Sequence, residues 1–438
     1  MYSSKLQAQL GKLGIDIGDR IKVLTQSGDF EGLLMPRPHY GDPDILVIKL
    51  STGYNVGVRA SSFELIEKAP PRKKRELPDE SPGKDGHISI LGCGGTIASR
   101  IEYTTGAVYP SISASELKLS FPALKRWQIH SKQIFSLFSE DMNATHWKML
   151  AEALEGEIAG GASGIVVMHG TDTMTYTSAA ISFMIQNTPV PIVFVGAQRS
   201  SDRPSSENEM NILNSAFTAS KDLAEVAVCM HASTNDDFCY VHRGTRVRKM
   251  HTSRRDAFHS IDSNPLAAVD YRSDMFNTLS PYRKRGESGD MKVSKTVNDN
   301  VALVYVHPNI KPSLISKLSD YDGVVLIGTG LGHVPTNAFG DKTVRSIYEP
   351  VKGLIESGIP VVMSSQCING RICMRVYTNG RLLMDAGVIG DDADWTPETA
   401  YAKLCYALGQ TKDMKKVQEI MMTNITGEIS PRSATQIV

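Results

Sequence analysis

The chain has 438 residues, of which 41% are hydrophobic and 21% are charged. This length exceeds one ordinary hydrophobic core and predicts a folded protein of two or three domains. Acidic and basic residues balance at 47 each, so the bulk charge gives no sign of a nucleic-acid-binding chain, although a local basic patch stays compatible with one. No stretch approaches the roughly 20 apolar residues of a membrane helix, and we expect a cytoplasmic protein with no membrane contact.

The first 70 residues predict a small β-barrel. A short helical start over Lys5–Leu13 is followed by brief runs of β-forming residues, with turns rich in Gly, Asp, Pro and Ser between them. Strands this short and this closely spaced are typical of a closed or half-closed barrel, which binds RNA or protein or packs against a neighbouring domain. The expected strands are Arg20–Thr25, Phe30–Met35, Ile45–Leu50, Asn55–Val58 and Phe63–Ile66.

Residues 71–86 predict a linker. Pro71, Pro78 and Pro82 remove backbone donors, and the charged residues between them favour water, so the segment is expected to be extended and exposed. A basic run, Arg72–Arg75, has the right charge for phosphate. Acidic residues follow within a few positions, however, and a solvated linker is the better interpretation.

From His87 the pattern changes to a mostly parallel α/β fold. Continuous apolar runs alternate with helix-like stretches, which is typical of parallel strands covered on both faces. A polar interval from 283 to 300 divides the runs, so we expect one domain over residues 87–290 and a second over 300–438. The expected strands are Ile88–Leu91, Gly164–Met168, Pro191–Val195, Val226–Met230, Val301–Val306, Gly323–Ile327 and Pro360–Met363; the expected helices are Ala144–Ile158, Thr175–Gln186, Asn208–Leu223 and Asp413–Met422.

Two glycine–threonine motifs follow two of these strands. Gly94-Gly95-Thr96 comes after Ile88–Leu91, and Gly170-Thr171-Asp172 comes after Gly164–Met168. In an open parallel sheet, ligands bind beyond the carboxyl ends of the strands, and glycine lets backbone N–H groups approach them closely. Such a place suits a hydroxyl nucleophile whose neighbouring N–H groups stabilise an oxyanion.

A hydroxyl nucleophile needs a base, and lysine is the best candidate here. His169 is as compatible with a core position as with catalysis, whereas Lys249 with Asp172 supplies a charge-tuned pair and Thr171 a proton relay. Each feature alone also has an ordinary structural explanation: Gly94-Gly95-Thr96 as a common turn, Thr171 or Asp172 as a helix N-cap, and Lys249 as a surface charge. Their joint occurrence in this order favours an amide-cleaving site built on threonine.

The cysteines give no sign of a metal site. None of the six forms a Cys-x-x-Cys pair and most lie in apolar runs, so we expect buried thiols rather than disulfides or zinc.

Together these segments resemble the L-asparaginase/glutaminase family of the bacterial two-domain type, over roughly His87–Ala407. The resemblance implies a two-domain asparaginase-like fold. It is carried by Gly94–Ala98, Glu102–Val108, Ser139–Met142, His169–Met174, Val195–Arg199, Arg246–Lys249, Asp256–Phe258 and Gly328–Gly330.

The resemblance also implies roles for individual residues. Thr96 would take the acyl group as a threonyl ester, and Tyr103 would help to position it from a mobile lid over Arg100–Pro110. A second relay would consist of Thr171, Asp172 and Lys249. The implied substrate-binding residues are Gly95, Ser139, Glu140 and Gly170.

The N-terminal extension narrows the resemblance further. Glu31–Arg37, Lys49–Gly57 and Ser364–Cys367 resemble the D subunit of archaeal-type glutamyl-tRNA(Gln) amidotransferases. This implies a glutaminase subunit that hydrolyses glutamine, or asparagine, and delivers ammonia to the E subunit, which converts Glu-tRNA(Gln) to Gln-tRNA(Gln). It also implies a homodimer within a heterotetramer, with tRNA bound mainly by the partner. No cofactor is expected in this chain, since it lacks a Gly-x-x-x-x-Gly-Lys-Ser/Thr loop; ATP and magnesium are expected in the partner subunit.

Three alternatives stay open. A stand-alone asparaginase or glutaminase with an unrelated appendage is the main one. The glycines Gly328, Gly330 and Gly332 after a strand weakly resemble a dinucleotide-binding turn. A binding barrel on an inactive scaffold is disfavoured by the intact Thr96, Thr171, Asp172 and Lys249.

Overall fold

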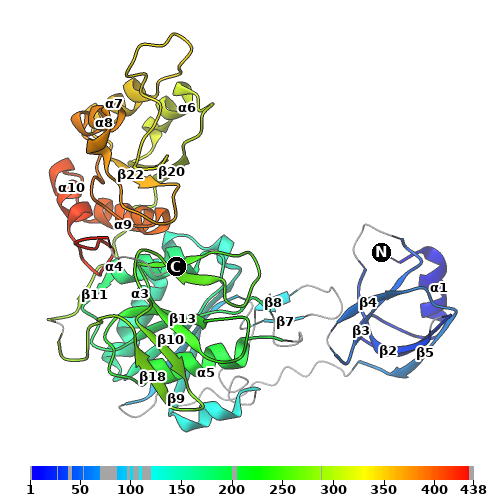
Figure 1. Cartoon of the computed structure of the whole chain (residues 1–438). Coiled ribbons are helices and arrows are strands. Elements are labelled where there is room, and N and C mark those ends of the chain that lie inside the picture. The colour runs from blue at the N-terminus through cyan, green and yellow to red at the C-terminus, as the bar shows by residue number, and fades with distance from the viewer. Residues whose placement is uncertain are drawn as a thin grey trace.

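The computed structural model shows an N-terminal sheet and two α/β units (Figure 1). For residues 99–101 and 108–110 it describes the backbone alone. The described residues are 2–26, 28–37, 42–52, 54–69, 86–95, 99–101, 108–110, 120–199, 205–287 and 289–433.

The N-terminal unit is an antiparallel sheet of five strands in the order β4-β3-β2-β1-β5. All five strands and the first helix were predicted within two residues of their bounds. The expected barrel is not confirmed, because β4 and β5 stay at the sheet's edges with no pairing between them among the described residues. The elements are α1 (Ser4–Lys12), β1 (Arg20–Thr25), β2 (Gly28–Leu34), β3 (Leu46–Leu50), β4 (Asn55–Val58) and β5 (Ser62–Glu67).

Helix α1 explains how an open sheet builds this core. Leu6 and Leu10 of the helix are buried in one cluster with Ile21, Leu34 and Ile48 of the strands. The apolar face of the sheet is therefore covered by a helix, and closure into a barrel is not needed to exclude water. Strand β5 is exposed along most of its length, as an edge strand is.

The central unit is built on a sheet of eight strands in the order β18-β17-β14-β13-β12-β10-β6-β9. Strands β13, β12, β10, β6 and β9 are neighbours in this order and pair in parallel, whereas β14, β17 and β18 pair antiparallel. The strands are β6 (Ile88–Gly94), β9 (Ile129–Leu137), β10 (Gly164–Met168), β12 (Ile192–Val195), β13 (Val226–His231), β14 (Cys239–Arg243), β17 (Ala267–Asp270) and β18 (Met275–Thr278).

Helices cover both faces of the parallel half. Along β10, Ile165 and Val167 join one buried cluster while Val166 and Met168 join the other, so both faces of the strand are buried. This is why the strand reads as a continuous apolar run in the sequence. The flanking helices are α3 (Ala144–Ala159), α4 (Met174–Met184) and α5 (Asn208–Ala219).

The C-terminal unit has three parallel strands in the order β20-β21-β22. Its helix α9 packs on α4 of the central unit, and α4 is buried along nearly its whole length. The elements are β20 (Val301–Tyr305), α6 (Pro312–Ser316), β21 (Gly323–Gly328), α7 (Tyr348–Glu356), β22 (Val361–Ser365), α8 (Thr378–Ala386), α9 (Pro397–Gln410) and α10 (Met414–Met422). The expected domain boundaries stay predictions.

The turn after β21 argues against dinucleotide binding. The Rossmann fingerprint places its glycines at the start of a helix, whose N-terminus holds the pyrophosphate. Here Thr329 and His333 pair with each other across the turn, and α7 begins only at Tyr348. The dinucleotide-binding interpretation is therefore wrong.

The remaining strands form three small ribbons. Strand β7 pairs with β8, the two ends of the segment predicted as a lid, and β15 pairs with β16. The third ribbon pairs β11 with β19. The ribbon strands are β7 (Ser99–Ile101), β8 (Val108–Pro110), β11 (Ile185–Gln186), β15 (Val247–Lys249), β16 (Phe258–Ser260) and β19 (Lys292–Val293); the 3₁₀ turns are η2 (Pro122–Arg126), η3 (Ser139–Asp141), η4 (Lys317–Asp320) and η5 (Met374–Val376).

Within the described residues, no helix is long and apolar enough to cross a membrane.

Candidate active site

Three predicted site segments meet at one edge of the central sheet. Strand β6 lies between β9 and β10, and all three run in parallel, so their carboxyl ends are adjacent. Gly95 follows β6, η3 with Ser139 follows β9, and His169 follows β10. The topology thus gathers segments that are distant in the sequence.

Glycines let these segments touch. Gly95 has φ +83°, and a Cβ there would lie 2.4 Å from the backbone N of Gly170. A Cβ on Gly170 would in turn lie 2.7 Å from the Cβ of Ser139. The three loops are therefore stacked with no room for a side chain between them, which explains why glycine precedes each threonine.

We expect Gly95→Ala to lower the rate of amide hydrolysis about 10²-fold, because the added methyl group must push the β6 and β10 loops apart. Steady-state ammonia release measures this. Gly156→Ala is the matched control. Gly156 lies in α3, and apart from the adjacent helix backbone no described atom is within 4 Å of the added carbon, so the activity of this variant should stay unchanged. Equal activity of Gly95→Ala and wild type would show that loop contact does not position the site.

A lysine–threonine–aspartate group lies beside these loops. Lys249 ends β15, and its Nζ donates to Thr171 Oγ1 at 2.9 Å and to Asp172 Oδ1 at 2.8 Å. The lysine side chain is 12% exposed, whereas that of Asp172 is 66% exposed. The carboxylate is thus fixed by the ammonium yet open toward solvent, where a ligand's own ammonium group can reach it.

His169 is a core residue and not a base. Its side chain is fully buried, and burial lowers its pKa to about 4, so the imidazole is neutral at pH 7. Its Nδ1 lies 2.7 Å from the carbonyl oxygen of Gly170, and its ring packs edge-on against Phe194. His169 therefore packs in the core next to the Gly170-Thr171-Asp172 loop and contacts its backbone.

The substrate-binding predictions have different surroundings. Ser139 is buried, and its carbonyl accepts a 2.7 Å hydrogen bond from Thr173 Oγ1, which ties η3 to the β10 loop. Glu140 is exposed. Thr96 and Tyr103 lie outside the described residues, so their predicted roles rest on the sequence.

The sequence analysis did not predict the buried contacts of Arg246, three residues before Lys249. Arg246 precedes β15 and is 2% exposed; it donates to Asp394 Oδ1 at 3.0 Å and to the carbonyl of Gly427 at 2.8 Å. Both acceptors belong to the C-terminal part of the chain. A basic residue in a short stretch with two further basic residues, Arg246–Lys249, is typical of a charged surface, so the sequence did not predict this contact.

Comparison with known proteins agrees with this geometry. Three family models match: "Asparaginase, N-terminal" over residues 87–280, "Glutaminase/Asparaginase C-terminal domain" over 300–421, and "GatD N-terminal domain" over 15–68. The solved L-asparaginase from Thermococcus kodakarensis has a TM-score of 0.71 and 30% identity, covering 79% of this chain and 100% of its own. L-asparaginase I from Vibrio cholerae has a TM-score of 0.66 and 27% identity, with the same coverage.

The fold and the site define an asparaginase-like amidohydrolase. Curated relatives extend the likeness over the whole chain. The D subunit of glutamyl-tRNA(Gln) amidotransferase from Thermofilum pendens is 45% identical, and the match covers 99% of this chain and 97% of the relative. The D subunit from Methanothermobacter thermautotrophicus is also 45% identical, covering 99% and 98% respectively. The chain belongs to the family of glutamyl-tRNA(Gln) amidotransferase D subunits.

Proposed function

We propose that this chain is the glutaminase subunit of a tRNA-dependent amidotransferase. It hydrolyses glutamine and supplies the ammonia with which a partner subunit converts Glu-tRNA(Gln) to Gln-tRNA(Gln). The observation that carries this proposal is the near full-length match to D subunits, which includes the N-terminal sheet outside the asparaginase-like units. A stand-alone asparaginase has no need of that sheet.

The chemistry assigned to the site is a two-step acyl transfer. Thr96 Oγ attacks the side-chain amide carbon of glutamine, the C–N bond breaks, and ammonia leaves with the proton that the hydroxyl gives up. Water then attacks the threonyl ester, glutamate leaves, and Thr96 regains a proton. Backbone N–H groups of the glycine loops are the donors available to the oxyanion of each tetrahedral intermediate.

The Lys249 group serves the second proton transfer. Lys249 Nζ contacts Thr171 Oγ1, so the hydroxyl links the reacting water to the lysine. As the free amine, Lys249 takes the water's proton through Thr171 and returns it to Thr96 when the ester bond breaks. Asp172 fixes the ammonium and is exposed enough to bind the substrate's α-amino group. Ser139 and Glu140 are assigned to the substrate's α-carboxylate and α-amino groups, and Tyr103 to positioning Thr96.

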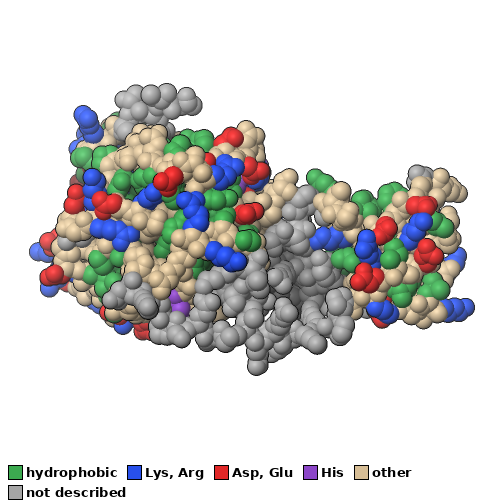
Figure 2. All heavy atoms as spheres, turned by 90° about the horizontal axis from the view of Figure 1, so that it is seen from below, with side chains coloured by type: hydrophobic (Ala, Val, Ile, Leu, Met, Phe, Trp, Pro, Cys, Tyr) green, Lys and Arg blue, Asp and Glu red, His purple; other side chains and the backbone are tan. Residues whose placement is uncertain are grey.

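Delivery of ammonia requires a partner. Ammonium is not a nucleophile, so ammonia must reach the second site before water protonates it. That second site, with ATP and magnesium, is assigned to the E subunit of the amidotransferase. The assignment of tRNA mainly to the partner fits the balanced charge of this chain, and Figure 2 shows basic and acidic side chains interspersed over the face it draws. We further propose a homodimer of this chain within a heterotetramer.

Ammonia release tests the proposal. The full-length chain should release little ammonia from glutamine alone and much more once the E subunit and Glu-tRNA(Gln) are added. Thr96→Ala should release none under either condition, which shows that the ammonia comes from this chain. High activity that is equal with and without the partner would instead make the chain a free asparaginase or glutaminase.

A further inference from the structure

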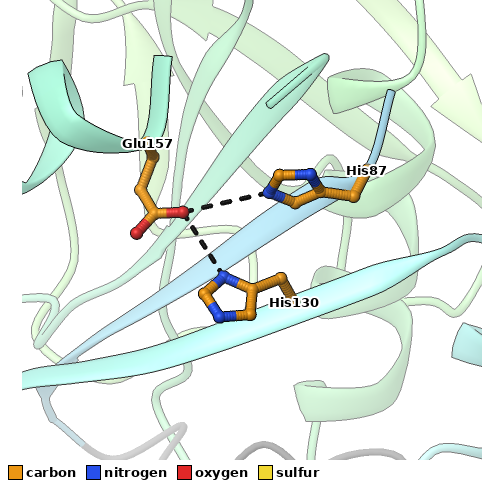
Figure 3. Close-up of side chains that lie close together, drawn as sticks. All are labelled: His87, His130 and Glu157. Carbon is orange, nitrogen blue, oxygen red and sulfur yellow. Dashed lines mark ion pairs between the residues drawn. The ribbon is translucent and has the colours of Figure 1, made fainter. Parts of the chain in front are cut away.

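A second cluster of ligand-type side chains lies at the other end of the central sheet. His87 directly precedes β6, His130 is the second residue of β9, and Glu157 is in the last turn of α3. Their side chains point toward one another (Figure 3), and one donor atom from each lies within 4.8 Å of the others. Because the candidate active site is at the carboxyl ends of β6 and β9, this cluster is separate from it.

The spacing of Glu157 from the two histidines is close to that of zinc ligands. Glu157 Oε2 lies 3.4 Å from His130 Nδ1 and 3.9 Å from His87 Nε2. Zinc bonds of about 2.0–2.1 Å place two ligands of a tetrahedral ion about 3.3–3.4 Å apart. The first separation matches that value, and a small rotation of the His87 ring would bring the second to it.

The described residues supply hydrogen bonds to only part of the cluster. Ser89 Oγ lies 3.0 Å from His87 Nε2 and donates to Glu157 Oε2 at 2.6 Å. His130 Nδ1, however, is buried without a hydrogen-bond partner among the described residues. Its nearest partner is Glu157 Oε2 at 3.4 Å. A buried nitrogen that makes no hydrogen bond is unfavourable because it has lost its contact with water, and coordination to a cation would remove that cost.

We propose that His87, His130 and Glu157 bind one zinc ion, with water as the fourth ligand. Two imidazoles and one carboxylate form a donor set that suits zinc, whereas magnesium and calcium take oxygen ligands. The three side chains are only 3%, 19% and 11% exposed, so the ion would be largely enclosed by protein. Ser89 keeps its hydrogen bond to Glu157 and orients the carboxylate.

The ion would join β6, β9 and α3, which otherwise meet through packing, strand pairing and the hydrogen bond from Ser89 to Glu157. Strand β9 is the edge of the central sheet, and η3 with Ser139 follows it directly. Helix α3 begins a few residues later, at Ala144, and ends near the cluster. Zinc at this end would fix the edge strand and the helix on either side of the segment that carries Ser139 and Glu140.

The test is zinc retention by the full-length chain. Chelator-treated protein is loaded with zinc sulfate, dialysed against metal-free buffer and analysed by mass spectrometry. We expect about one zinc per chain in wild type and in the control His307→Gln, whose histidine is on an exposed loop after β20. His130→Gln and Glu157→Gln should each retain less than a tenth of that, and zinc should raise the melting temperature of wild type but not of His130→Gln.

Cobalt provides a readout that needs no variant. Co²⁺ bound by wild type should show the strong visible absorption of a tetrahedral site, so the proposal can be decided even where a variant fails to fold. Absence of retained zinc in wild type, or equal retention in folded His130→Gln, would overturn it. The three side chains would then be only a buried polar cluster around Glu157.

Discussion

Lys249→Met is expected to lower kcat for glutamine hydrolysis about 10³-fold while the chain stays folded. The substitution keeps an unbranched side chain, one atom shorter, but removes the ammonium that contacts both Thr171 and Asp172. Without it, the Thr171 hydroxyl loses the group with which it exchanges a proton, and Asp172 loses the cation that holds it. Ammonia release, measured with the partner subunit and tRNA present, gives the rate, and circular dichroism checks the fold.

The controls separate the relay from a general effect of charge. Lys295→Met removes a lysine whose ion pair with Glu155 lies on the surface, and it should keep wild-type activity. Thr171→Val should lose about as much activity as Lys249→Met, and the double variant should lose little more, since residues that act as a unit are not additive. A Lys249→Met enzyme within tenfold of wild type would remove the lysine from the mechanism.

The core strands of the site were predictable because their burial determines their residue pattern. Strands β6 and β10 are buried on both faces and read as unbroken apolar runs, and the glycines that follow mark the turns. The position of these turns at the carboxyl ends of parallel neighbours then follows from topology. The contact of Lys249 with Asp172 did not follow from periodicity; it was expected only because the residues occurred in a set.

The sequence did not predict helices α7, α8 and α9, although α9 is largely buried, and it did not predict several strands of the central sheet. Strand β9 is only partly buried because it is the sheet's edge, and it reads as polar. Strands β14, β17 and β18 extend the sheet in antiparallel directions, which short runs do not encode. Closure of the N-terminal strands depends on what covers their apolar face, and α1 supplies that cover. The His87 cluster joins residues from three elements, so no local spacing reveals it.

The contact between the central and C-terminal units also bears on the site. Arg246 reaches Asp394 and Gly427, while Lys249 lies three residues further along the same segment. Lys249 therefore sits on a strand whose start is fixed by a buried ion pair with the other unit. The planar guanidinium of Arg246 donates several hydrogen bonds in fixed directions, and these hold the start of β15 in place. The ammonium of a lysine at this position would not reproduce that geometry.

We therefore expect Arg246→Met to lower the free energy of unfolding by about 3 kcal/mol. The change leaves Asp394, which is 1% exposed on its side chain, with the weaker ion pair to Arg371 at 3.5 Å. Urea unfolding followed by tryptophan fluorescence measures the loss, and Trp395 beside Asp394 is a local probe. Hydrolysis should also slow in the folded protein, because the start of β15 is no longer held.

Lys352→Met is the matched control for this prediction. Lys352 pairs with Glu356 on an exposed face of α7, at 3.6 Å, so its loss should change the free energy of unfolding by less than about 0.5 kcal/mol. Arg246→Lys should recover part of the stability, since it restores a cation, but less of the activity, since it cannot hold Asp394 and Gly427 together. A stable Arg246→Met protein with normal turnover would show that Lys249 is positioned by the β15–β16 ribbon alone.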